Sequence, residues 1–184
     1  MPTFSSDGVE IYYQMAGEGY PLVMAHEFAG DMTSWEPQAN YFTRRYQVIT
    51  YCHRGYPPSE VPDYLEAYSL EMQVEDLYRL LQHLGIGQAH ISGLSMGGGV
   101  ALNFAIAHPE MCRSLVIASV GAGSDSDGQV RQVESWRSLS EYMVNEGMEK
   151  FSAVSAKGPT RLQFLRKDPE GWAKYKYGLA HHSA

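Results

Sequence analysis

Short apolar runs alternate with amphipathic helical patterns along the first 118 residues, and this alternation restricts the fold more than any other feature of the sequence. A short apolar run between helical patterns suits a strand that is buried on both faces, as parallel strands joined by helices are. We therefore predict an α/β fold with a mostly parallel sheet covered by helices. The strands are expected at 9–14, 22–25, 48–51, 90–92 and 115–118. The first of them alternates with period two after the Asp7-Gly8 turn, which indicates a hairpin strand.

Helices are predicted between these strands. The clearest covers 70–84, where Leu and Val recur every three or four positions between an N-cap at Ser69 and a stop at Gly85. Another helix is expected after a cap at Ser34, and a third begins at Met96.

Composition and pattern both change near residue 120. Residues 1–110 contain 4 Lys/Arg and 13 Asp/Glu, whereas residues 111–184 contain 10 and 8. A Gly/Ser/Asp-rich stretch at 119–128 is expected to form a loop, and helical patterns without a clear strand follow it. We predict that residues 1–122 form the N-terminal part of a sheet-containing core and that residues 123–184 form a helical cap segment.

Charge and composition argue against several classes of function. A net charge of −7 disfavours nucleic acid or an anionic membrane as a partner. No apolar run is long enough to span a membrane and no secretory signal is evident, so we expect a soluble cytoplasmic protein. Cys52 and Cys112 are expected to be buried, unpaired thiols. The sequence shows no metal-ligand cluster, phosphate loop or dinucleotide fingerprint, and we expect neither a metal nor a cofactor.

One motif predicts chemistry: Gly93-Leu94-Ser95-Met96-Gly97 fits the pattern G-x-S-x-G. It follows a predicted strand and opens a glycine-rich helix, which is the context in which a serine is displayed on a sharp turn. Gly93 and Gly97 leave room for neighbouring chains, and the helix N-terminus directs backbone N–H groups at charge that develops on an attacked carbonyl. We predict that Ser95 is a nucleophile; an incidental serine on a glycine-rich turn is the alternative.

With two further segments, this motif resembles the α/β-hydrolase family, in its serine-hydrolase branch. The family's His-Gly-x-x-Gly loop has its counterpart in residues 26–30, its Arg-Gly-x-Gly-x-Ser segment in residues 54–59, and its Asp-Leu pair in residues 76–77. The resemblance implies a mostly parallel α/β-hydrolase sheet with flanking helices and a helical cap, truncated after the cap. It also implies an oxyanion hole formed by the backbone N–H groups of Phe28 and Met96.

Glu27 departs from the family, which usually has glycine at this position. A carboxylate would repel a developing oxyanion, so we expect its side chain to point away or to bind a nearby polar group, in a structural role. His26 is likewise expected to brace its loop rather than to act as a base.

A serine hydroxyl needs a base that is itself oriented by a carboxylate. In the family these residues follow the cap, in the order Ser, Asp or Glu, His, so we expect them outside this chain. The candidates within it are His181, His182, Asp125 and Asp127, for which a frayed terminus and a solvated loop are the expected roles. An exposed apolar sheet edge further suggests a fragment, or a chain covered by a partner such as a second copy.

Two functions are therefore considered. The first is hydrolysis of small carboxylic esters or lactones through an acyl intermediate on Ser95; carbon–carbon bond hydrolases and cofactor-free perhydrolases stay open, whereas a serine disfavours the dehalogenase and epoxide-hydrolase branches. The second is a truncated or degenerate, non-catalytic member that binds a ligand or partner through the sheet edge. Four aromatic residues of the cap segment could contact an apolar substrate but are expected to be core: Trp136, Tyr142, Phe151 and Trp172.

Overall fold

The computed structural model describes residues 2–121 and 126–184, and it divides into two compact units between Val120 and Gly121. The boundary expected from the sequence, after residue 122, lies two residues further along the chain. None of the described helices is both long and apolar enough to cross a membrane.

A six-stranded sheet in the order β1-β2-β4-β3-β5-β6 forms the first unit. The β1/β2 and β2/β4 pairs are antiparallel, and the other pairs are parallel. All five strands expected from the apolar runs are present, and β1 is an additional strand that forms a hairpin with β2. The strands are β1 (Thr3–Ser6), β2 (Val9–Ala16), β3 (Tyr20–Ala25), β4 (Tyr46–Tyr51), β5 (Ala89–Leu94) and β6 (Cys112–Ala118).

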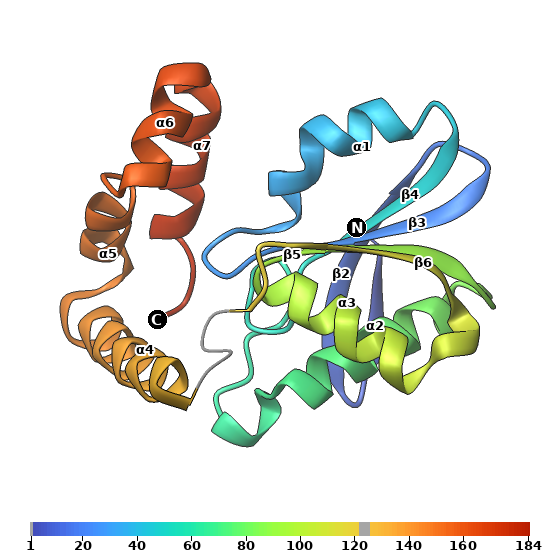
Figure 1. The fold of residues 1–184 in the computed structure, drawn as a ribbon, viewed down its shortest axis with the longest axis horizontal. Coiled ribbons are helices and arrows are strands. Elements are labelled where there is room, and N and C mark those ends of the chain that lie inside the picture. The colour runs from blue at the N-terminus through green and yellow to red at the C-terminus, as the bar shows by residue number, and fades with distance from the viewer. Residues whose placement is uncertain (1, 122–125) are drawn as a thin grey trace. The chain divides into compact units, whose positions relative to one another are not determined.

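Helices cover both faces of this sheet (Figure 1). α1 (Glu36–Phe42) lies on one face, and α2 (Leu70–His83) and α3 (Met96–Ala107) lie on the other. The main core lies beneath α2 and α3, where alternate residues of the central strands are buried; a smaller cluster lies beneath α1. Three short 3-10 helices occur in the connections: η1 (Met32–Trp35), η2 (Leu65–Ala67) and η3 (Pro109–Met111).

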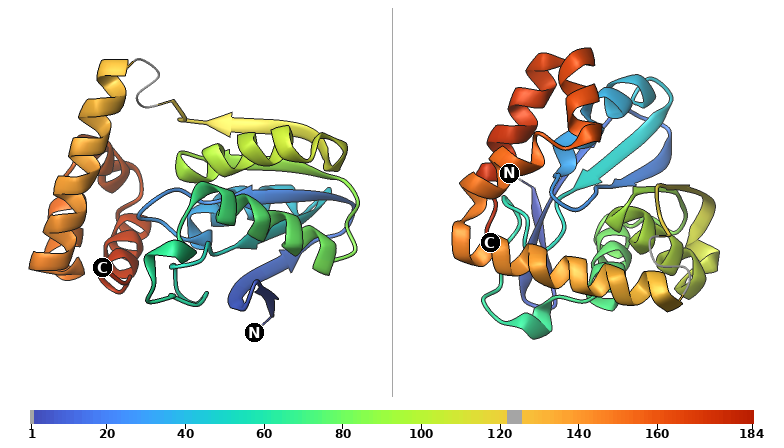
Figure 2. Two further views of the ribbon diagram at one scale, coloured as in Figure 1. Left: turned by 90° about the horizontal axis from the view of Figure 1, so that it is seen from below. Right: turned by 60° about the vertical axis from the view of Figure 1, so that its left-hand side comes forward.

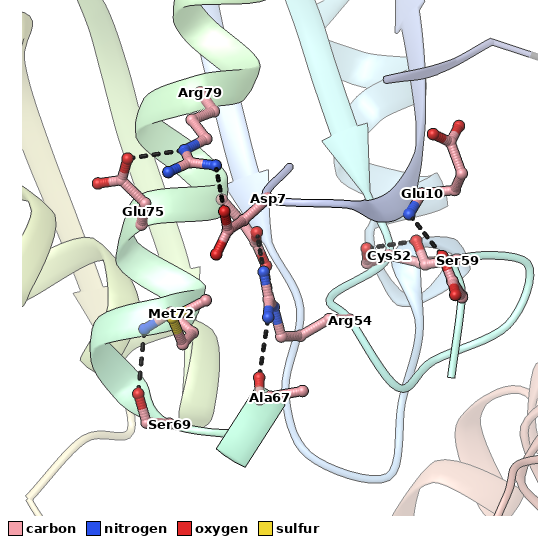
Figure 3. Close-up of polar contacts among 12 residues, drawn as sticks. Asp7, Glu10, Cys52, Arg54, Ser59, Ala67, Ser69, Met72, Glu75 and Arg79 are labelled. Carbon is pink, nitrogen blue, oxygen red and sulfur yellow. Dashed lines mark hydrogen bonds and ion pairs between the residues drawn. The ribbon is translucent and has the colours of Figure 1, made fainter. Parts of the chain in front are cut away.

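The predicted ends of α2 are confirmed, whereas the predicted cap of α1 is wrong. Ser69 accepts a hydrogen bond from the backbone N–H of Met72 at 3.1 Å (Figure 3), and Gly85 follows the helix with φ +67°. Ser34 lies inside η1, which is capped by Asp31 instead. The reason is that the helical turn begins earlier in the chain than expected, at Met32, so that Trp35 occupies the N-cap position of α1 and makes no side-chain cap.

A buried ion pair joins the loop after β4 to α2. Arg54 donates two hydrogen bonds of 2.7 Å to the two carboxylate oxygens of Asp76 and a third, of 2.9 Å, to the carbonyl of Ala67 (Figure 3). Both charged side chains are almost fully buried. Because all these bonds cross between segments far apart in sequence, the pair fixes the loop after β4 against the helix.

β6 forms one edge of the sheet (Figure 2). Among the described residues, no strand pairs with its outer side. Val116 and Ile117 in this strand are 57% and 40% exposed. The apolar edge that was expected from the sequence is therefore present in the described chain.

Four helices make up the second unit: α4 (Ser126–Glu146), α5 (Met148–Ser155), α6 (Pro159–Lys167) and α7 (Pro169–Ala180). α7 packs against α5 and α6, with Phe151 and Leu179 buried. The hydroxyl of Ser152 donates to the carbonyl of Lys176 at 2.6 Å, and the indole N–H of Trp172 donates to that of Ala156.

Two expectations about individual aromatic and acidic residues of this unit need correction. Trp136 is exposed on α4 and is not a core residue, because the long helix leaves most of its surface open. Asp127 lies in the first turn of α4 rather than in a loop, since the helix begins at Ser126, where an acidic side chain is favoured. Asp125 lies outside the described residues.

The two cysteines differ in burial. Cys52 is fully buried, and burial raises the pKa of its thiol to about 12. Cys112, at the start of β6, is only partly buried, contrary to expectation, because it lies in the edge strand. Both are free thiols.

Candidate active site

Ser95 occupies the single residue between the end of β5 and the start of α3. Its backbone adopts φ 51° and ψ −113°, a conformation that non-glycine residues rarely adopt, and its side chain is exposed. The backbone N–H of Ser95 donates to the carbonyl of Ala118 at 2.8 Å, which ties the turn to the end of β6. The serine is thus displayed on a strained turn that neighbouring strands hold in place.

Unlike Ser69, Ser95 does not cap the helix that it precedes. Both residues precede a helix, but Ser69 has an extended backbone and its hydroxyl caps α2. Ser95 makes no side-chain cap to α3. Because the first amides of a helix have no acceptor within the helix, the N-terminus of α3 keeps donors available next to the Ser95 hydroxyl.

Two glycines allow the backbone to pack closely around this turn. A Cβ at Gly93 would come within 2.6 Å of the backbone nitrogen of Gly98, and a Cβ at Gly97 would come within 2.6 Å of the carbonyl oxygen of His26. Any side chain at either position would therefore displace backbone atoms. The start of α3 is in direct contact with the chain that leaves β3.

The register of the parallel strands explains this contact. Ala25, the last residue of β3, lies opposite Gly93 of β5. The loop at 26–30 and the turn at Ser95 therefore lie side by side at the carboxyl-terminal ends of β3 and β5. This arrangement places the segments that carry Phe28 and Met96 next to each other, and the role of their N–H groups as oxyanion donors stays a prediction.

The loop at 26–30 forms a tight turn in which the N–H of Gly30 donates to the carbonyl of Glu27 at 3.3 Å. Ala29, the third residue of the turn, has φ +61°, as in a type II turn, where glycine is the usual residue. The ring of His26 connects this turn to the segment after β4. Its Nδ1 lies 2.9 Å from the carbonyl oxygen of Glu27, and its Nε2 lies 3.1 Å from the backbone nitrogen of His53.

These contacts assign the tautomer of His26. The backbone N–H of His53 can only donate, so Nε2 of His26 accepts and the proton resides on Nδ1, which donates to Glu27. Both ring nitrogens are engaged in a fully buried imidazole. This geometry supports the bracing role that was expected for His26.

The side chain of Glu27 folds back over its own loop. It is 8% exposed, and its Oε1 accepts from the hydroxyl of Ser34 at 3.1 Å. Its Oε2 is buried and has no hydrogen-bond partner in the part of the chain that the structure describes. The contact with Ser34 is of the kind expected from the sequence, namely a nearby polar group.

Tyr56 is a site residue that the sequence reasoning missed. Its hydroxyl donates to the sulfur of Met96 at 3.7 Å, and its ring lies against that of His26, with the ring centroids 4.9 Å apart. Tyr56 therefore contacts both the start of α3 and the residue that leads into the loop at 26–30. Burial raises the pKa of this hydroxyl, and the nearby Glu27 adds to the effect, which keeps it protonated. The available signal was position, because Tyr56 follows β4, the strand beside β3, in the segment that resembles the family.

His53 is fully buried, and neither of its ring nitrogens has a hydrogen-bond partner among the described residues. Burial lowers its pKa well below 6.5, and proximity to His26 lowers it further. Below pH 6.5 this imidazole is protonated in the unfolded chain but stays neutral in the folded chain. Protonation therefore favours the unfolded state, and the protein loses stability as the pH falls below 6.5.

We expect acidification from pH 7.5 to pH 5.0 to reduce the free energy of unfolding of the wild type by about 2 kcal/mol more than that of His53→Phe. Urea denaturation at the two pH values measures this difference. His90→Gln is the matched control for the loss of a histidine, because His90 is partly exposed and bonded to Ser114 rather than fully buried. Equal dependence in the wild type and His53→Phe would contradict the prediction.

Comparisons with known proteins agree with this architecture. Residues 20–173 match the family model described as the alpha/beta hydrolase fold. The chain is 26% identical over 184 residues to 3-oxoadipate enol-lactonase 2 of Acinetobacter baylyi, with 99% of this chain and 66% of that protein covered. The family resemblance drawn from the sequence is confirmed.

Two solved structures are similar in fold. An enol-lactonase from Burkholderia xenovorans has a TM-score of 0.84 at 24% identity, covering 98% of this chain and 68% of that chain. A thermophilic esterase from Thermogutta terrifontis has a TM-score of 0.83 at 26% identity, covering 98% and 65%. The chain thus spans about two thirds of the length of these proteins, and the predicted fold class, a mostly parallel sheet with flanking helices, is confirmed.

Proposed function

Because the chain belongs to the α/β-hydrolase fold family, we propose that it is a serine hydrolase that cleaves small carboxylic esters or lactones through an acyl intermediate on Ser95. The observation that carries the proposal is the backbone at Ser95, which is strained, exposed and unused as a helix cap. Strain of this kind persists only where the surrounding structure enforces it, and it is concentrated at functional sites. A serine with a purely structural role at this position would resemble Ser69.

In the proposed reaction, Oγ of Ser95 attacks the carbonyl carbon of the substrate while a base removes the hydroxyl proton. The carbonyl oxygen gains negative charge and accepts hydrogen bonds from the backbone N–H groups of Phe28 and Met96. When the C–O bond to the leaving alkoxide breaks, the same base returns the proton to that oxygen. Water then attacks the acyl-serine in the same manner and releases the acid.

The base and its orienting carboxylate belong, in this proposal, to sequence outside the 184 residues. Support comes from the first unit, in which His26 has both ring nitrogens engaged and His53 is fully buried. His181 in the second unit already directs its Nδ1 to the carbonyl of Tyr177. The names of the similar proteins, an enol-lactonase and an esterase, support ester-like substrates.

A fluorophosphonate probe tests the proposal directly, since it reacts only with an activated serine. We expect the natural protein, isolated from its source, to be labelled on Ser95, and mass spectrometry would identify the modified peptide. Ser69→Ala is the control, because it removes a serine that also precedes a helix without touching the site. Absence of labelling in the folded protein would overturn the proposal.

The exposed edge at β6 favours a second candidate function, that of a non-catalytic module that binds a partner by strand addition. Val116 and Ile117 provide apolar side chains beside unpaired backbone groups, which are the two features that such pairing needs. The probe experiment separates the two candidates, because a binding module would leave Ser95 unlabelled.

A further inference from the structure

The turn at residues 27–30 is under backbone strain at Ala29. A left-handed backbone costs a residue with a Cβ on the order of 1 kcal/mol relative to glycine. Such a conformation is kept only where the surroundings determine it. The contacts that hold this turn therefore matter for the position of Phe28, its second residue.

The carboxylate of Glu27 occupies the interior of this turn. A Cβ at Gly30 would come within 2.6 Å of Cδ of Glu27 and within 2.8 Å of Oγ of Ser34. Gly30 is thus required for space, because its missing side chain leaves the volume that the carboxylate fills. Together with the hydrogen bond from Ser34, this packing connects the two ends of the turn to the start of η1.

The sign of the charge opposes the proposed chemistry. A negative charge in the turn that contains Phe28 would repel a developing oxyanion, so it would not be favoured for electrostatic catalysis. The contacts of the carboxylate with Ser34 and Gly30 point instead to a geometric role.

We propose that Glu27 is a positioning residue that, through Ser34, locks the strained turn at 27–30 and thereby sets the orientation of the Phe28 amide. The inference deepens the proposed function, in which that amide receives the oxyanion. Geometry and charge then have separable effects, because Gln can fill the same space and accept from Ser34 without the charge.

The test compares Glu27→Gln, Glu27→Ala and Ser34→Ala. For hydrolysis of a small aryl ester, we expect Glu27→Ala to lower kcat by about tenfold to a hundredfold with KM little changed, since misplacement of a donor acts on the transition state. Ser34→Ala should lower kcat in the same direction. Glu27→Gln should equal or exceed the wild-type kcat. Glu36→Ala, an exposed carboxylate at the start of α1, is the matched control and should leave kcat unchanged.

Amide hydrogen exchange gives a readout that does not depend on catalysis. We expect exchange at Gly30, whose N–H donates to the carbonyl of Glu27 and closes the turn, to accelerate at least about tenfold in Glu27→Ala and to stay near the wild-type rate in Glu27→Gln. Unchanged exchange in both Glu27→Ala and Ser34→Ala would overturn the inference. So would a loss of kcat in Glu27→Gln as large as in Glu27→Ala. If the wild type hydrolyses no ester and is not labelled at Ser95, the proposed function fails, while exchange still decides whether Glu27 locks the turn.

Discussion

Ser95→Ala is expected to lower kcat/KM for ester hydrolysis by about 10⁴-fold to 10⁶-fold, because the variant has no atom that can form the acyl intermediate. Steady-state assays with a chromogenic ester measure the loss. The remaining rate would come from backbone donors that still bind the developing oxyanion. A variant that keeps more than about one hundredth of the wild-type rate would show that another group is the nucleophile.

The strain at this position supplies a control for folding. Ser95→Gly also removes the nucleophile, but it relieves the positive φ of 51°. We expect Ser95→Gly to be more stable than Ser95→Ala by about 1 kcal/mol while being equally inactive. A difference in stability between two equally inactive variants would separate the chemical role of the hydroxyl from any general effect of mutation on the fold.

Asp76→Ala is expected to destabilise the protein by about 3–5 kcal/mol, because it leaves the guanidinium of Arg54 buried without its counter-charge. The variant also loses two hydrogen bonds of 2.7 Å. Urea denaturation followed by circular dichroism measures the change in the free energy of unfolding. A loss below about 1 kcal/mol would mean that Arg54 finds water or another partner.

The neighbouring residue in α2 provides the control for this variant. Glu75 also pairs with an arginine, Arg79, at 2.8 Å (Figure 3), but both side chains of this pair are more than one third exposed. Glu75→Ala should cost no more than about 0.5 kcal/mol, since solvent screens an exposed pair. Comparing Asp76→Ala with Glu75→Ala therefore isolates the effect of burial, because both carboxylates lie on α2, have the same charge and pair with an arginine.

The sequence predicted the sheet well because the apolar runs reflect burial on both faces. β3, β4 and β5 each lie between neighbours and beneath helices, so each contains buried apolar residues that the sequence displays. The Asp7-Gly8 turn predicted that β2 belongs to a hairpin, and the antiparallel pairing of β1 with β2 confirms this. The bounds of β1 itself were not predicted, because Thr3–Ser6 alternates exposed and buried residues and contains only one large apolar side chain.

The candidate site was predictable in its motif and less so in its supporting contacts. The motif around Ser95 has a local cause, a turn that needs glycine at fixed spacing, so the sequence displays it directly. The roles of Tyr56 and Ser34 depend on three chain segments meeting at one edge of the sheet. Ser34 was assigned to a helix cap because local sequence favours that use, but the helical turn begins earlier, at Met32, and Ser34 lies inside it with its hydroxyl donating to Glu27.

The missing side chain at Gly97 has a consequence for how activity and stability are related. Since the helix start rests on the carbonyl of His26 with no side chain between them, the two backbone segments behave as one rigid piece. The proposed oxyanion-binding geometry would then be established during folding, before any ligand arrives, without a closing movement. Core substitutions that shift β3 against β5 by a fraction of an ångström would be felt at the proposed reaction centre, even when the protein still melts at its usual temperature.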